Sequence, residues 1–159
     1  MRIKLGNLTY LLYEETQTAA VVGCPDYVST VSIPNTVTFD GLNYTVTKIG
    51  EGAFGRCKSL KSVMLPDSVT SIGDSAFGAC KSLESITIPD SVVKIGDCAF
   101  YNCHNLKSIT IPDSVTSIWD HAFDRCESLT EICIPGTEKA FPLWVSLMDS
   151  EYADLVRQV

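Results

Sequence analysis

The sequence predicts a repeat solenoid, in which short strands and short helical turns stack as successive coils of a β-rich superhelix. Three observations predict it: a 23-residue unit recurs without gaps, the same positions are apolar in every copy, and both flanks depart from the pattern as end caps do. We therefore expect one domain over residues 1–159, with a β cap over 1–30, repeats over 31–135 and a helical cap over 136–159.

Three consecutive segments carry the repeat. They are residues 60–82 (LKSVMLPDSVTSIGDSAFGACKS), 83–105 (LESITIPDSVVKIGDCAFYNCHN) and 106–128 (LKSITIPDSVTSIWDHAFDRCES). A modified unit precedes them from Val31, and another begins at Leu129. A unit this small buries too little apolar surface to fold alone, so the copies must stack and share one elongated core.

Each unit is expected to contain a strand, a turn, a second strand and a turn of helix. Residues 63–65 alternate between buried and exposed positions, which is typical of a strand with one buried face. Pro66 ends this strand because it lacks a backbone donor. A second extended piece over 69–72 is followed by one helical turn that holds Ala76, Phe77 and Cys80.

The pattern LxxIxIPxSVxxIGxxAFxxC resembles the BspA-like class of leucine-rich repeats, whose unit carries the IP dipeptide and the AFxxC segment. The resemblance covers about two thirds of the chain. It implies a right-handed leucine-rich-repeat superhelix of α/β character, used for binding or for building bacterial cell-surface assemblies. It implies no catalytic activity.

The N-terminal flank is expected to form a β-hairpin cap, because apolar residues alternate on both sides of Gly6-Asn7. An insertion over about residues 38–47 shows the same alternation around Asp40-Gly41. It predicts a hairpin that extends the first coil, and the alternative is a protruding ligand loop.

The C-terminal flank is expected to be helical, with Phe141, Trp144, Val145 and Met148 on one face. Trp119 stands where other units have glycine, and we expect its ring to fill space against this helix. The alternative is an exposed aromatic binding patch formed with residues 141 and 144.

Cysteines recur once per unit at the end of the AFxxC segment. A thiol there is expected to act as a small apolar plug that donates weakly to backbone carbonyls, rather than as a disulfide partner or metal ligand. This structural thiol column comprises Cys57, Cys80, Cys103 and Cys126. Outside it lie Cys24, Cys98 and Cys133, of which Cys98 is expected to be the most reactive.

Two columns of carboxylates also follow the period. One contains Asp74, Asp97 and Asp120, and the other Asp67, Asp90 and Asp113. Aligned carboxylates suggest calcium, but the glycine-rich nonapeptide of calcium-binding repeats is absent. We expect the first column to cap the amides of the helical turns.

The outward positions of the first strands form a stripe rich in hydroxyl groups. This candidate protein-contact stripe comprises Ser62, Met64, Ser85, Thr87, Ser108 and Thr110. The alternative is that serine and threonine simply suit exposed strand positions.

The composition and the motifs of the chain exclude several classes of function. The chain is 45% hydrophobic with a net charge of −7 and without a Lys/Arg-rich stretch, which argues against disorder and nucleic-acid binding. No apolar run is long enough to span a membrane, and no enzyme motif is present. We expect a non-catalytic protein-interaction module without cofactor or metal, or alternatively a structural or adhesive surface protein that contacts host matrix.

The expected partner is an unknown protein, bound by a monomer. The sequence shows no signal peptide. The chain is therefore expected in the cytoplasm if Met1 is its native start, and outside the cell or on its surface if a signal has been removed.

Overall fold

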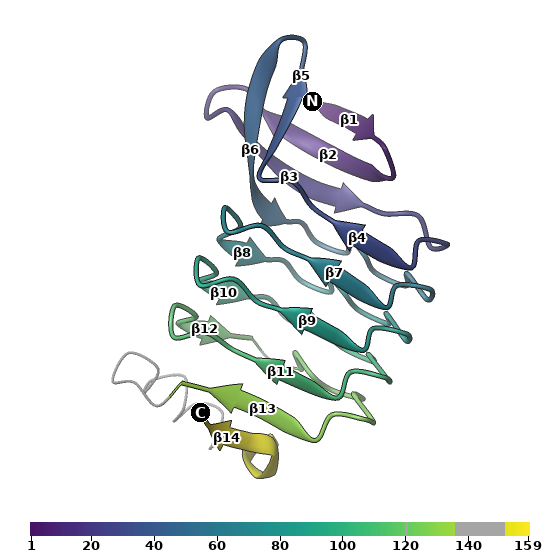
Figure 1. Ribbon diagram of the computed structural model, residues 1–159, viewed down its shortest axis with the longest axis vertical. Helices are drawn as coiled ribbons and strands as arrows, with labels where there is room; N and C mark the ends of the chain where they lie inside the picture. The colour runs from purple at the N-terminus through teal and green to yellow at the C-terminus, as the bar shows by residue number, and fades with distance from the viewer. Residues whose placement is uncertain (120, 136–151) are drawn as a thin grey trace.

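A computed structural model describes residues 1–119, 121–135 and 152–159 as a solenoid of stacked coils. Its strands form two sheets that run along the stack (Figure 1). The eight-stranded sheet contains β1 (Arg2–Leu5), β2 (Leu8–Tyr13), β3 (Thr18–Gly23), β5 (Thr36–Phe39), β6 (Leu42–Ile49), β8 (Ser71–Ile72), β10 (Lys94–Ile95) and β12 (Ser117–Ile118). The six-stranded sheet contains β4 (Thr30–Ser32), β7 (Ser62–Met64), β9 (Ser85–Thr87), β11 (Ser108–Thr110), β13 (Glu131–Ile134) and β14 (Val156–Gln158).

Each repeat contributes one strand to each sheet. Identical positions pair in parallel, so that Val63 lies beside Ile86 in the six-stranded sheet and Ile72 lies beside Ile95 in the eight-stranded sheet. The inward side chains of both sheets are buried. The predicted solenoid and its two strands per repeat are therefore confirmed.

The predicted helical turn is wrong. Residues 74–79 form consecutive turns instead, and backbone N–H groups alternate between two kinds of partner. The amides of Ala76 and Gly78 bond within the turn, whereas those of Ser75, Phe77 and Ala79 bond to carbonyls of the next coil at 2.7–2.8 Å. Ser75 and Ala79 have positive φ angles of 52° and 60°. In an α-helix all of these amides would donate to carbonyls of the same segment. Here every second amide donates to the next coil instead, so hydrogen bonds between coils replace those of a helix.

Stacked phenylalanines fill the core behind these turns. The rings of Phe54, Phe77, Phe100 and Phe123 stack with centroid separations of 5.1, 5.3 and 5.7 Å and near-parallel planes. Such ring pairs contribute about 0.5–1.5 kcal/mol each beyond the burial of their area. Tyr152 closes the column edge-on, 5.6 Å from Phe123.

The glycine before each turn permits close approach of successive coils. A Cβ added at Gly96 would lie 2.4 Å from Oδ1 of Asp74, which accepts a hydrogen bond from the amide of Asp97 at 3.0 Å. The expectation that Asp74 caps a helical turn is thus wrong, because its carboxylate bonds to the following coil. In the last repeat the glycine is replaced by Trp119, and Oδ1 of Asp97 is buried without a hydrogen-bond partner among the described residues.

The N-terminal end is closed by β1, β2 and β3, which extend the eight-stranded sheet beyond the first coil (Figure 1). The insertion forms an antiparallel hairpin of β5 and β6. Its turn residues Asp40 and Gly41 both have positive φ, at 50° and 74°. These angles are those of the tight turns that match the twist of the flanking strands.

The C-terminal end departs from the predicted helical cap. The described residues there form a 3₁₀ turn (Ala153–Leu155) and β14, which pairs in parallel with β13. Val156 is buried in this pairing. The predicted helix face at residues 141, 144, 145 and 148 lies outside the described residues. Trp119 is 62% exposed, and the helix against which its ring is expected to pack lies outside the described residues.

Candidate functional site

The candidate stripe runs along the outward face of the six-stranded sheet. The parallel register places Ser62 beside Ser85 and Met64 beside Thr87, and Thr87 beside Thr110. Met64 is 65% exposed. Of the stripe residues, Ser62 is half-buried, and exposed positions are held by Met64, Ser85, Thr87, Ser108 and Thr110.

Hydroxyl groups elsewhere on the coils bond to the neighbouring coil. The hydroxyls of Ser68, Ser91 and Ser114 each donate to a carbonyl 22 residues earlier at 2.6–2.7 Å. Thr70 donates to Thr47 at 3.2 Å in a second column. These side chains serve the stacking itself, and sequence reasoning did not single them out.

Most hydroxyl groups of the stripe are not used in hydrogen bonds between the coils that the structure describes. Within the described part of the chain, the side chains of Ser62, Ser85, Thr87 and Ser108 make no hydrogen bond to the protein. Their donors and acceptors face solvent and are available to another molecule. The stripe is therefore a regular polar surface with one large apolar side chain, Met64, near its N-terminal end.

The thiol column lies inside the core. Cys80, Cys103 and Cys126 donate to the carbonyls of Phe54, Phe77 and Phe100 at 3.0, 3.2 and 3.1 Å. Cys57 donates to the backbone carbonyl of Cys24 at 3.5 Å, so the N-terminal cap supplies the acceptor that a phenylalanine supplies in the later coils. All seven thiols are free.

Burial governs the ionisation of these thiols. It raises the pKa of Cys57 and the pKa of Cys80 to about 12. Desolvation, with the nearby carboxylate of Asp97, also raises the pKa of Cys98. A raised pKa means less thiolate at neutral pH, so the described surroundings of Cys98 do not favour its reactive form.

Carboxylates and histidines lie at separate points on the coils. His121 Nδ1 lies 2.8 Å from an Asp124 oxygen, and His104 Nδ1 lies 3.8 Å from Glu127. In the part of the chain that the structure describes, no three His, Cys, Asp or Glu side chains are arranged to hold a metal ion. The described segments also include no helix of the length and apolarity that a membrane crossing requires.

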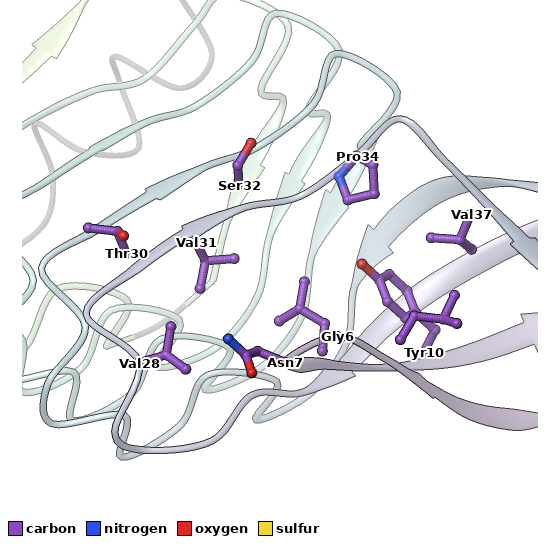
Figure 2. Close-up of a pocket in the computed structure, with 11 residues that line it drawn as sticks. Gly6, Asn7, Tyr10, Val28, Thr30, Val31, Ser32, Pro34 and Val37 are labelled. Atoms are coloured by element: carbon purple, nitrogen blue, oxygen red, sulfur yellow. The ribbon is translucent and has the colours of Figure 1, made fainter.

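An apolar groove of about 440 Å³ lies between the N-terminal hairpin and the first strand of the six-stranded sheet (Figure 2). Leu8, Tyr10, Val28 and Val37 line it and are buried, and Val31 of β4 forms part of its wall. Sequence reasoning missed this groove because its lining comes from separate segments. The only sequence signal was the hairpin at Gly6-Asn7.

Comparison with known proteins decides the family. Residues 28–143 match the BspA type leucine rich repeat region in six copies. The chain belongs to the BspA-type leucine-rich repeat family. This family is a repeat scaffold and is not known as an enzyme family.

Solved structures of bacterial proteins support the assignment of this BspA-type chain. A leucine-rich repeat protein from Bacteroides capillosus is 32% identical with a TM-score of 0.77, over 85% of this chain and 99% of that one. One from Bacteroides ovatus is 34% identical with a TM-score of 0.64, over 83% and 40%. A leucine rich cell surface protein from Faecalibacterium prausnitzii is 31% identical with a TM-score of 0.64, over 85% and 45%.

The chain spans less than half the length of the last two proteins. No curated protein matches it. The relatives point to a bacterial origin.

Proposed function

We propose that this BspA-type chain is a non-catalytic protein-interaction module, which binds a protein partner on the candidate stripe. The main support for this proposal is a difference between two sets of hydroxyl groups. Those of Ser68 and Ser91 donate to the neighbouring coil, whereas those of Ser85 and Ser108 make no such bond among the described residues. A row of free donors and acceptors on a rigid sheet suits an extended protein surface.

Rigidity supports the same proposal. The stripe residues stand on strands whose inward neighbours, such as Ile86 and Ile109, are buried in the core. A partner that binds there orders few protein side chains, because serine and threonine have little rotamer freedom to lose. The carboxylate of Glu131, half-buried on β13, adds one charge beside the stripe.

Arginine substitutions test this proposal. The double variant Ser85→Arg/Ser108→Arg places two long cations on the stripe without touching the core, and Val93→Arg, at an exposed position that precedes β10, is the matched control. We expect the wild type and the control to capture the same protein from a lysate of the source organism, and the double variant to lose it. Equal capture by all three would contradict the proposal.

The second candidate function is a structural or adhesive surface protein that contacts host matrix. It is favoured by the likeness to the Faecalibacterium prausnitzii structure, which is described as a cell surface protein. Labelling intact cells with an antibody against the chain tests this candidate. Labelling without permeabilisation supports a surface location, and labelling only after permeabilisation supports the cytoplasm.

A further inference from the structure

The first strand of the six-stranded sheet has one unpaired edge. β4 pairs only with β7 among the described residues, in parallel, with Val31 opposite Val63. The amide of Ile33 bonds to Met64, and the carbonyl of Ser29 accepts from Ser62. Backbone groups alternate in direction along a strand, so the N–H and C=O groups of Thr30 and Ser32 face away from β7.

That free edge borders the apolar groove described above. Figure 2 shows Asn7 and Gly6 of the hairpin on one side and the strand with Val31 on the other. Val28 is only 8% exposed and forms part of the lining. The edge thus combines unused main-chain donors and acceptors with a hydrophobic surface at the same place.

Tyr10 adds a hydroxyl group to the lining of the groove. The residue as a whole is only 2% exposed. Burial raises the pKa of Tyr10, which keeps the hydroxyl protonated and able to donate.

We propose that the β4 edge binds an extended segment of a partner protein, which adds a strand to the six-stranded sheet and places an apolar side chain in the groove. The sheet itself indicates the form of this segment. Every following repeat supplies a short strand with a central apolar residue between outward residues, as Ser108, Ile109 and Thr110 do. A segment of the same form would continue the ladder on the free side of β4.

This site differs from the candidate stripe, which uses side chains on the face of the sheet. An added strand would lengthen that face by one row, beside Thr30 and Ser32. The two proposals can therefore fail separately.

A peptide with the sequence of residues 106–112 (LKSITIP), acetylated and amidated at its ends, is a suitable probe. Saturating peptide should slow hydrogen exchange at the amides of Thr30 and Ser32 by at least about tenfold, because pairing would protect these free groups. The amide of Ile33, already bonded to β7, should change little. A control peptide with aspartate in place of the central isoleucine should give no protection.

Protein variants complete the test. Ser32→Pro removes an outward N–H and should weaken peptide binding about tenfold or more, whereas Ser32→Ala keeps that N–H and should bind within about twofold of the wild type. Absence of peptide-dependent protection at Thr30 and Ser32 would overturn the proposal. Protection that grows with protein concentration without peptide would also overturn it, because a second copy would then occupy the edge.

Discussion

The thiol of Cys80 donates to the carbonyl oxygen of Phe54, with a sulfur-to-oxygen distance of 3.0 Å. Cys103 and Phe77 repeat this relationship one coil later at 3.2 Å. The carbonyl of Phe54 already accepts from the amide of Cys57 at 3.0 Å, so the thiol is a weak second donor that reaches it from the next coil. The cysteine column therefore joins successive coils while filling space, which accounts for its recurrence without disulfides or metal.

Alkaline solutions should destabilise the fold through these thiols. Burial raises the pKa of Cys80 to about 12 from about 9. The unfolded chain then loses this proton first, so the stabilisation is complete below pH 9 and declines as the pH rises toward 12. Each such thiol should lower the free energy of unfolding by up to about 1.4 kcal/mol per pH unit in that interval.

Urea unfolding of Cys80→Ala at several pH values checks this expectation. Above about pH 9 the variant should lose stability less steeply than the wild type, because one titrating thiol is gone. Cys98→Ala, which removes a half-buried thiol outside the column, should leave the slope closer to that of the wild type. Parallel curves for the wild type and Cys80→Ala would show that burial does not hold this thiol neutral.

Gly96→Ala should lower the free energy of unfolding by at least about 2 kcal/mol. Its new methyl group would meet Oδ1 of Asp74 at 2.4 Å and the Asp74 amide at 2.7 Å. The matched control is Gly78→Ala, where the nearest atom would lie 3.3 Å away. Thermal unfolding of both variants measures the difference, and equal losses would mean that the spacing between coils is not set at Gly96.

Ala79→Gly should stabilise the protein by about 0.5–1 kcal/mol, although it removes a methyl group. Ala79 has a positive φ of 60°, a conformation that an L-residue with a Cβ adopts at a cost. Ala76→Gly, in the same turn but fully buried and without a positive φ, should destabilise it. Chemical unfolding measures the change in the free energy of unfolding for both variants. Destabilisation by Ala79→Gly would argue against strain in these turns.

Deletion of residues 152–159 should cause aggregation. The deletion removes β14 from the edge of β13 and Tyr152 from the end of the phenylalanine column, so that Phe123 and Ile132 lose their cover. Exposed apolar surface next to a free strand edge favours association. Removal of the exposed Val159 alone is the control, and light scattering should separate the two. A monomeric deletion variant would show that these residues are not a cap.

Much of the solenoid could be predicted from the repeat. Strands with the pattern of Ser85, Ile86 and Thr87 alternate strictly and end before proline, so their position and buried face follow from local chemistry. The columns of Phe77 and Cys80 follow from the period alone, since identical positions must stack.

The prediction of a helical turn was wrong because the apolar pattern of so short a segment is the same for two kinds of compact backbone. The spacing of Ala76, Phe77 and Cys80 buries the same side chains in a helix and in consecutive turns with positive φ at Ser75 and Ala79. What decides between them is hydrogen bonding to the next coil, which a single repeat does not reveal. A hint is that residues tolerant of positive φ, such as Gly52 and Asn102, occur at these positions in other copies.

The N-terminal groove and the C-terminal strand could not be predicted for a different reason. The groove is lined by Leu8, Val28 and Val37 from separate segments, and only the tertiary fold brings them together. β14 has a single buried residue, Val156, which is too little for a strand pattern. Both features lie where the repeat ends, so the periodicity of the sequence no longer predicts the structure there.

Site-specific photo-crosslinking tests whether the partner contacts the outward face of the six-stranded sheet. A photoreactive residue is introduced at Thr87 on the stripe or at Val93 away from it, both exposed. We expect adducts with one partner protein from position 87 and none from position 93. Adducts from position 93 alone, or equal adducts from both positions, would contradict it.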